Sequence, residues 1–157
     1  MSLVRILVDG YSLIHGWPSM AGGYPPFSEQ ARDSLVQRMQ QFVDASGTPV
    51  TVFFDGASTK GNVGEMSTRM VEVLFSKKGQ TADSLIERAA YRFKSYGDVL
   101  VVTDDGAERE IVHSMGALIQ SCDSFGREVE GATNQVRAKV AKQRKKENRG
   151  FKNPILE

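Results

Sequence analysis

The sequence predicts an α/β fold, a three-layer α/β/α sandwich with a mostly parallel five-stranded sheet and a basic C-terminal helix. Two observations support this prediction. Short apolar runs, three of which stop at an acidic residue beside a glycine, alternate along the chain with segments of helical periodicity. The runs are continuously apolar and rich in β-branched residues, which is typical of strands that helices cover on both faces of a parallel sheet.

The predicted strands form a clear group and a weaker group. The clear strands are residues 4–8, 50–54 and 99–102, and the weaker strands are residues 70–75 and 117–120. Asp9-Gly10 follows the first clear strand, Asp55-Gly56 follows the second, and residues 103–106, with two aspartates and a glycine, follow the third. Each clear strand is therefore expected to end in an acidic loop.

Helical periodicity separates the predicted strands. Helices are expected at residues 28–45, 81–94, 105–114 and about 123–147. In the first of them, Leu35, Met39 and Phe42 recur at helical spacing, and Gly47 supplies a stop. Residues 16–27 hold three of the five prolines, so they are expected to form a loop, as are residues 56–64.

Length and composition fit one globular domain. The 157 residues are 40% hydrophobic and 25% charged, which suits a single core. We expect this domain over residues 1–122, with a helix and basic tail over residues 123–157 that pack on it or extend from it. Cys122 is the only cysteine, which excludes an intramolecular disulfide and a cage of thiolate ligands. Since neither a secretion signal nor a long apolar span is evident, we expect a soluble, cytoplasmic protein without a membrane partner.

The charge of the chain is unevenly divided. Residues 137–157 carry eight basic and two acidic side chains, a net charge of +6, whereas the rest of the chain carries −5. An acidic body with a basic extension indicates a polyanionic partner for the extension. Four residues of it are candidate RNA-binding residues, namely Lys142, Arg144, Lys145 and Lys146. The alternative is a solvated helix end without a partner.

Acidic residues stand where the predicted strands end. Four of them hold such positions: Asp9, Asp55, Asp104 and Asp105. Because ligands bind at the carboxyl edge of an open parallel sheet, these side chains are expected at the binding edge. Asp83 and Glu87, in the first turns of the helix 81–94, share one helix face and can point to the same edge. Crowded carboxylates repel one another unless a cation neutralises them, and hard oxygen ligands favour Mg²⁺ or Mn²⁺.

Helix capping is the alternative explanation for some of these acids. Asp105 and Glu108 match a capping box, in which Asp105 caps the helix and Glu108 reaches back to it. Asp83, behind a candidate cap at Thr81, lies where any acid gains from the helix dipole. Capping explains less well why Asp9 and Asp55 also end buried strands, where asparagine or serine would serve a turn equally well. Taken together, the acids favour a site.

Several segments carry a family resemblance in their order and spacing. They are Val8-Asp-Gly-Tyr-Ser-Leu-Ile14, Val52-Phe-Phe-Asp55, Val71-Glu-Val-Leu-Phe-Ser76 followed by Thr81-Ala-Asp83, and Val102-Thr-Asp-Asp105 followed by Glu108. Together they resemble the YacP-like branch of the bacterial NYN domains, within the PIN-like nuclease superfamily. The resemblance covers about residues 4–120, and Trp17-Pro18 and the basic C-terminal helix are also similar to that branch.

The resemblance implies a metal-dependent endoribonuclease that binds Mg²⁺ or Mn²⁺ in an acidic pocket. The catalytic aspartates of the family fall on Asp9, Asp83 and Asp105, and we expect their carboxylates within one coordination sphere of an ion. Asp55 and Asp104 are further candidate metal ligands. One departure concerns Ser12, which stands where the family usually has asparagine and which supplies a hydroxyl but no amide.

Other residues are expected to support the metal ligands or to bind RNA. The supporting group orients waters or ligands and consists of Ser12, Thr103, Glu87 and Glu108. Tyr11 and Trp17 follow the first acidic loop and are candidates for stacking on the bases of single-stranded RNA, with packing at the sheet edge as the alternative.

Two other functions stay open at this point. One is a non-catalytic adaptor for RNA or the ribosome, in which the acidic pocket is only a metal-stabilised scaffold and the basic tail binds. The other is a receiver-like phosphoacceptor domain, which also gathers aspartates at strand ends. The latter fits worse, since its acid pair would follow the first strand and a lysine would follow the last. No phosphate-binding loop or dinucleotide fingerprint occurs at any strand-to-helix turn.

Overall fold

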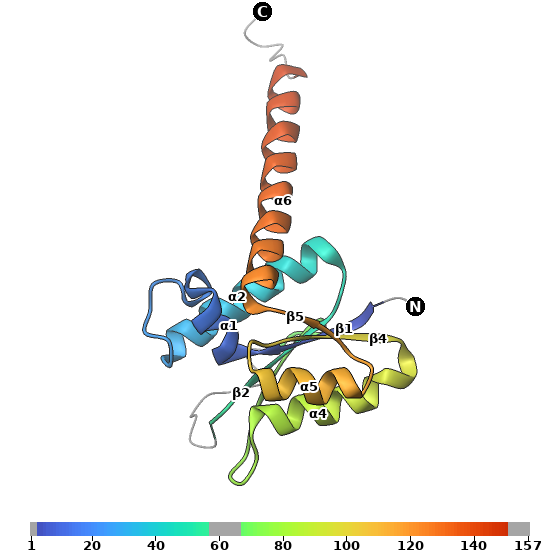
Figure 1. Cartoon of the computed structure of the whole chain (residues 1–157). Coiled ribbons are helices and arrows are strands. Elements are labelled where there is room, and N and C mark those ends of the chain that lie inside the picture. The colour runs from blue at the N-terminus through green and yellow to red at the C-terminus, as the bar shows by residue number, and fades with distance from the viewer. Residues whose placement is uncertain (1–2, 57–66, 151–157) are drawn as a thin grey trace, which may run out of the picture.

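The fold is a five-stranded parallel sheet between two layers of helices (Figure 1). The computed structural model describes residues 3–56 and 67–150. Its strands are β1 Leu3–Asp9, β2 Val50–Phe54, β3 Val71–Phe75, β4 Asp98–Val102 and β5 Leu118–Gln120. They lie in the order β3-β2-β1-β4-β5, and each neighbouring pair is parallel. The predicted fold class is confirmed, and the order excludes the receiver-like alternative, whose sheet has the order 2-1-3-4-5.

The described residues form seven helical elements. They are α1 Gly10–Gly16, η1 Pro18–Ala21, α2 Glu29–Ser46, α4 Ala82–Phe93, η2 Lys94–Tyr96, α5 Gly106–Ser114 and α6 Cys122–Gly150. The four that were predicted, α2, α4, α5 and α6, begin and end close to the predicted positions. Ser28 caps α2 by accepting from the backbone N–H of Ala31, and Gly47 ends it with a φ of 76°. Both termini follow from side-chain chemistry that the sequence shows.

The two faces of the sheet have separate cores. Figure 1 shows α1, α2 and the start of α6 over one face, and α4 and α5 over the other. Along β1, Ile6 and Val8 belong to the first core, whereas Leu7 belongs to the second. This alternation buries the middle of the strand completely, which is why its sequence is continuously apolar.

Two helical elements lie where a loop or no element was expected. Pro18–Ala21 forms η1 inside the predicted loop 16–27, and α1 follows β1 directly. The prediction missed α1 because a seven-residue helix with a glycine at each end has almost no periodic pattern, although Leu13 and Ile14 are buried. The predicted loop 56–64 lies outside the described residues apart from Gly56.

Helix α6 extends slightly beyond the predicted range of about 123–147 at both ends. It runs without a break from Cys122 to Gly150, so the basic segment is helical as far as the structure describes it. Phe125 and Val129 are buried against the body, whereas every residue of 134–149 is exposed. We call residues 134–149 the arm, which projects from the body in Figure 1. No helix of the described residues is both long and apolar enough to cross a membrane.

Candidate active site

The candidate site lies at the point in the sheet where the order of the strands reverses, between β1 and β4. Strands β1 and β4 are neighbours, and from them the chain proceeds to β2 and β3 on one side and to β5 on the other. Val8 pairs with Val102, so the residues after both strands emerge side by side. Open α/β sheets bind ligands outside the carboxyl ends of their strands at such a point.

Asp9 and Asp105 each begin a helix at this edge. Oδ1 of Asp9 accepts a hydrogen bond from the backbone N–H of Ser12 at 3.2 Å. Oδ1 of Asp105 accepts from the N–H groups of Ala107 and Glu108 at 3.0 and 3.2 Å. In both residues Oδ2 accepts no hydrogen bond from a described residue, so one oxygen caps a helix and the other is open to a ligand.

Asp55 fixes the helix that carries Asp83. Oδ1 of Asp55 accepts from the N–H of Ala82 at 2.7 Å and from the hydroxyl of Ser76 at 3.4 Å, which ties the end of β2 to the start of α4. Thr81, with its side chain accepting from Ser84 N–H, is the N-cap of α4, as predicted. Asp83 is therefore in the first turn of the helix without being its cap, and it keeps the favourable place at the helix dipole that the alternative explanation gives it.

The carboxylates of this edge are close enough to disturb one another. The pKa of Asp9 is raised to about 6, mainly by burial, with additional contributions from the carboxylates of Asp83, Asp55 and Asp105, while its capping hydrogen bond opposes the shift. The pKa of Asp83 is also raised by burial, and then by Asp105, Asp55 and Glu87. Four of the predicted aspartates thus meet at one edge, and Glu87 joins them.

Glu108 is a sixth acid of this group and differs from the prediction. It is only 2% exposed, and neither of its carboxylate oxygens has a hydrogen-bond partner among the described residues. The capping box is therefore wrong in its second half, because Glu108 does not reach back to the backbone of Asp105. Burial raises the pKa of Glu108 well above its ordinary value, and the carboxyls of Glu87, Asp83 and Asp9 add to the shift.

These six residues form what we call the acidic cluster: Asp9, Asp55, Asp83, Glu87, Asp105 and Glu108. No lysine or arginine of the described residues forms an ion pair with any of them. Hard oxygen donors, an unpartnered buried carboxylate and raised pKa values are the chemistry that a divalent cation satisfies. The residues present therefore fit Mg²⁺ or Mn²⁺ in their donor chemistry.

The spacing within the acidic cluster is wider than predicted. Within residues 3–56 and 67–150, no three histidine, cysteine, aspartate or glutamate side chains are grouped tightly enough to hold an ion. The expectation that Asp9, Asp83 and Asp105 share one coordination sphere is not met in this conformation.

Asp104 and Ser12 are engaged beside the acidic cluster. Oδ1 of Asp104 accepts from the backbone N–H of Cys122 at 2.9 Å, and Asp104 N–H donates to Oγ of Ser12 at 3.2 Å. Ser12 Oγ also lies 3.4 Å from Sγ of Cys122. Asp104 is not among the residues that raise the pKa of Asp9, and its contacts are those of a residue that fixes the start of α6. Thr103 is buried, and its Oγ1 accepts from Asp105 N–H at 3.2 Å.

The link between Cys122 and the site was not predicted. Burial is the main cause that raises the pKa of its thiol to about 12, so the thiol stays protonated and unreactive at neutral pH. The contact joins residues 110 positions apart, and no sequence pattern marks a pairing at that separation.

Tyr11 packs within the body. Its ring centroid lies 5.0 Å from that of Phe54 and 5.1 Å from that of Phe27, and its hydroxyl accepts from Arg32 at 3.3 Å. These contacts favour the packing alternative for Tyr11, and stacking on RNA stays a prediction.

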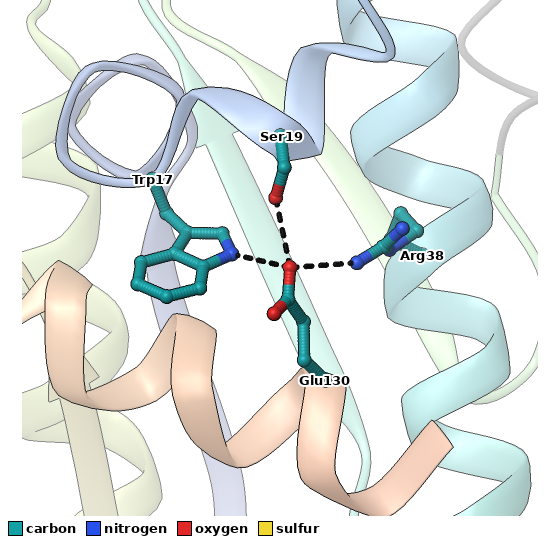
Figure 2. Close-up of polar contacts among 4 residues, drawn as sticks. All are labelled: Trp17, Ser19, Arg38 and Glu130. Carbon is teal, nitrogen blue, oxygen red and sulfur yellow. Dashed lines mark hydrogen bonds and ion pairs between the residues drawn. The ribbon is translucent and has the colours of Figure 1, made fainter. Parts of the chain in front are cut away.

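Trp17 packs against α6. Its Nε1 donates to Oε1 of Glu130 at 2.9 Å (Figure 2). A Cβ at Gly126 would lie 2.4 Å from Cγ and Cδ2 of the indole, so the ring sits directly on the backbone of α6. Packing is again favoured over stacking on a base. The four predicted RNA-binding residues of the arm, Lys142, Arg144, Lys145 and Lys146, are exposed.

Comparisons with known proteins identify close relatives. The model of the YacP-like NYN domain matches residues 6–157. Protein YacP of Bacillus subtilis (strain 168) is 34% identical over 138 residues, which are 87% of this chain and 81% of that protein. The crystal structure of Rae1 (YacP) from Bacillus subtilis superimposes with a TM-score of 0.76 at 31% identity, over 96% of this chain and 86% of that one. A crystal structure of a mutant of the same protein gives a TM-score of 0.73 at 33% identity, over 88% and 81% of the two chains.

Proposed function

This chain belongs to the YacP-like NYN domain family, and from this premise we propose that it is a metal-dependent endoribonuclease that hydrolyses phosphodiester bonds of RNA. NYN domains are generally nucleases, so the family supports the reaction class. The observation that carries the proposal for this chain is the acidic cluster, in which burial of Asp9, with smaller contributions from the carboxylates of Asp83, Asp55 and Asp105, raises the pKa of Asp9 to about 6.

The residues of the acidic cluster have separable roles in this proposal. Asp9 and Asp105 hold Mg²⁺ or Mn²⁺ through the oxygens that helix capping leaves open, and Asp83, which caps no helix, holds it through its own carboxylate. A bound divalent ion supplies a Lewis acid that lowers the pKa of water and neutralises phosphate oxygens. Asp55 positions the first turn of α4, and Thr103 positions Asp105. Glu108, for which burial favours the protonated form, holds a proton within reach of the cluster.

In this proposal the basic arm, and not the acidic cluster, attracts the RNA. An acidic cluster repels phosphate, and the body of the chain carries −5 outside residues 137–157. The exposed basic residues of the arm supply the opposite sign and bind the RNA backbone. We propose RNA that is single-stranded at the bond to be cut, because a strand must reach the open carboxylate oxygens at the sheet edge. The ribosome can present such RNA. In this proposal the ribosome is contacted by the arm.

A non-catalytic RNA adaptor is the second candidate. One observation favours it, namely that no three acidic side chains of the described residues are grouped tightly enough to hold an ion. In this candidate the arm binds RNA and the acidic cluster has no chemical role. Only measured cleavage separates the two.

The test is RNA cleavage by purified protein and two aspartate variants. The protein is incubated with labelled single-stranded RNA in Mg²⁺, in Mn²⁺ and in EDTA. We expect metal-dependent cleavage by the wild type and by Asp33→Asn, a control that changes an exposed aspartate on α2, and none by Asp9→Asn. Asparagine also caps helices, so Asp9→Asn retains the start of α1. Equal cleavage by Asp9→Asn and the wild type would reject the nuclease, and RNA binding without any cleavage would support the adaptor.

A further inference from the structure

The first turn of α6 is attached to the loops that carry the catalytic aspartates. Cys122 N–H donates to Asp104, the neighbour of Asp105, and Cys122 Sγ lies beside Ser12, three residues after Asp9. The fit is close, since a Cβ at Gly16 would lie 2.6 Å from Cβ of Cys122. The start of α6 therefore cannot move without moving the edge of the site.

A second attachment, about two turns farther on, fixes the direction of α6. Oε1 of Glu130 accepts hydrogen bonds from Trp17 Nε1 at 2.9 Å, from Ser19 Oγ at 3.0 Å and from the Arg38 guanidinium at 3.5 Å (Figure 2). The three donors come from the α1–η1 segment and from α2. Close contact between Trp17 and Gly126 leaves no room for the helix to rotate. Two attachments along one continuous helix define its axis relative to the site.

The arm continues this axis into solvent. Its residues 134–149 span about 24 Å at 1.5 Å per residue, and all of them are exposed. Lys139, Lys142, Lys146 and Arg149 follow one another at intervals of three and four residues, so they form a single row along the helix. Like charges at this spacing oppose helix formation, and an unpacked helix of this length is marginal in water. A regular anionic partner along the row would stabilise it.

The composition of the arm indicates what this partner is. The arm has no aromatic side chain, so it offers nothing on which an unpaired base stacks. It offers a straight row of cations, which suits a regular phosphate backbone whose bases are hidden, as in double-stranded RNA. An anionic membrane surface fits less well, since Val136 and Val140 are its only large apolar residues.

We propose that α6 is a rigid spacer: its arm binds the backbone of a double-stranded RNA element, and its two attachments hold the active site at a fixed distance over the adjoining single strand. This inference rests on the proposed nuclease function and adds a substrate class to it, RNA with a duplex beside a single strand. The bond to be cut is then selected by its distance from the duplex and not by base identity. Glu130, Trp17 and Gly126 are positioning residues in this scheme.

The spacer is tested by lengthening it. Seven helix-forming, uncharged residues inserted after Thr133 move the basic row about 10 Å outward and keep it close to its original face. The insertion falls where the buried part of α6 has ended, so the body folds as before. As a matched control, the same seven residues are inserted after Gly150, beyond the basic row. The probe is an end-labelled RNA hairpin with a single-stranded extension of uniform sequence.

We expect the wild type and the control to cut the extension at the same dominant position, and the insertion after Thr133 to cut at least one nucleotide farther from the hairpin. A second variant, Asn134→Gly with Gln135→Gly, loosens the exposed helix between the body and the basic row and should spread the cuts over several positions. Unchanged cut positions in both variants would overturn the spacer and leave the nuclease intact. If the wild type cuts no RNA in Mn²⁺ or Mg²⁺, the proposed function fails and the spacer with it.

Discussion

The acidic cluster and the arm both gather like charges, but only the acidic cluster withdraws some of them from solvent, namely Glu108 and, in part, Asp9, Asp83 and Glu87. At the sheet edge, burial is the first cause of the raised pKa values of Asp9 and Asp83, and the neighbouring carboxylates add to it. In the arm, every basic residue is surrounded by solvent, where screening weakens repulsion beyond about 8–10 Å. Partly buried like charges at the sheet edge thus favour a small cation held in one place, whereas the exposed like charges of the arm favour a polyanion that lies along them.

Substitutions in the acidic cluster and in the arm should differ most in their effect on the rate of RNA cleavage. Asp83→Asn should lower the rate of RNA cleavage by at least two orders of magnitude, because it removes an oxygen ligand of the metal and changes no cap. Neutralising Lys142 in the arm should leave the rate at saturating RNA unchanged. Single-turnover cleavage measures both. If the two substitutions lower the saturated rate equally, the division between chemistry at the edge and binding by the arm is wrong.

The stability of the metal-free protein should depend on pH through Asp9. Its folded pKa of about 6 lies above the ordinary value of 3.8, so the folded state binds the proton more tightly than the unfolded state. Stability is therefore lost as the pH rises from about 4 to about 6, by about 3 kcal/mol for this group. Denaturant unfolding in EDTA should show that the unfolding free energy of Asp9→Asn rises relative to that of the wild type as the pH increases from about 4 to about 6. A difference that does not change with pH would contradict the raised pKa of Asp9.

Divalent ions should reverse this loss. Mg²⁺ or Mn²⁺ that binds only the folded protein stabilises it by about 2.7 kcal/mol at a hundredfold excess over the Kd. Thermal melting at neutral pH should show an increase for the wild type and for Asp33→Asn, but a much smaller one for Asp9→Asn. An equal increase in all three proteins would place the ion somewhere other than the acidic cluster.

A smaller effect is expected where α6 meets the body. Gly126→Ala brings a methyl group against the indole of Trp17 and should cost about 1–3 kcal/mol of unfolding free energy. Gly131→Ala is the matched control, because a Cβ at Gly131 has no heavy atom within 4 Å. Alanine there should stabilise the helix by up to about 1 kcal/mol. Denaturant unfolding should therefore show a loss of unfolding free energy for Gly126→Ala and a gain for Gly131→Ala. Equal changes in the two variants would contradict the close contact between Trp17 and Gly126.

The smallest effect on stability is expected from the arm itself. Removing residues 141–157 should change the unfolding free energy by less than about 0.5 kcal/mol, because residues 141–149 are exposed. RNA binding should nevertheless weaken, and its salt dependence should flatten by about one unit of slope for each phosphate that the removed side chains neutralise in the wild type. Filter binding over a series of salt concentrations tests this. Unchanged affinity would mean that the arm is only a solvated helix end.

Local sequence patterns predicted the parts of the fold that local chemistry determines. The clear strands are those with continuous apolar runs, and Ser28 and Gly47 mark the ends of α2 because capping is a short-range interaction. The convergence of Asp9, Asp55 and Asp105 followed from one rule about parallel sheets, which requires only the order of the elements.

The rest of the site depends on contacts between distant segments. Glu108 matches a capping residue in sequence, and only the packing of α5 on α4 shows that its carboxylate is buried beside Glu87. Asp104 matches a metal ligand, but the docking of α6 turns it toward Cys122. Trp17 and Glu130 are 113 positions apart, and neither residue alone indicates the other. Such contacts are set by tertiary packing, which single-sequence patterns do not contain.

The independence of the arm from the body has an evolutionary consequence. Because residues 134–149 contribute no buried surface, mutations there escape the selection for folding that constrains the rest of the chain. Under the proposed function, a change in the length or charge of this segment alters which RNA is bound and requires no compensating change around Asp9. If the proposed function holds, relatives with the same body can acquire new RNA targets by changing the arm alone, and divergence among them should concentrate after Thr133.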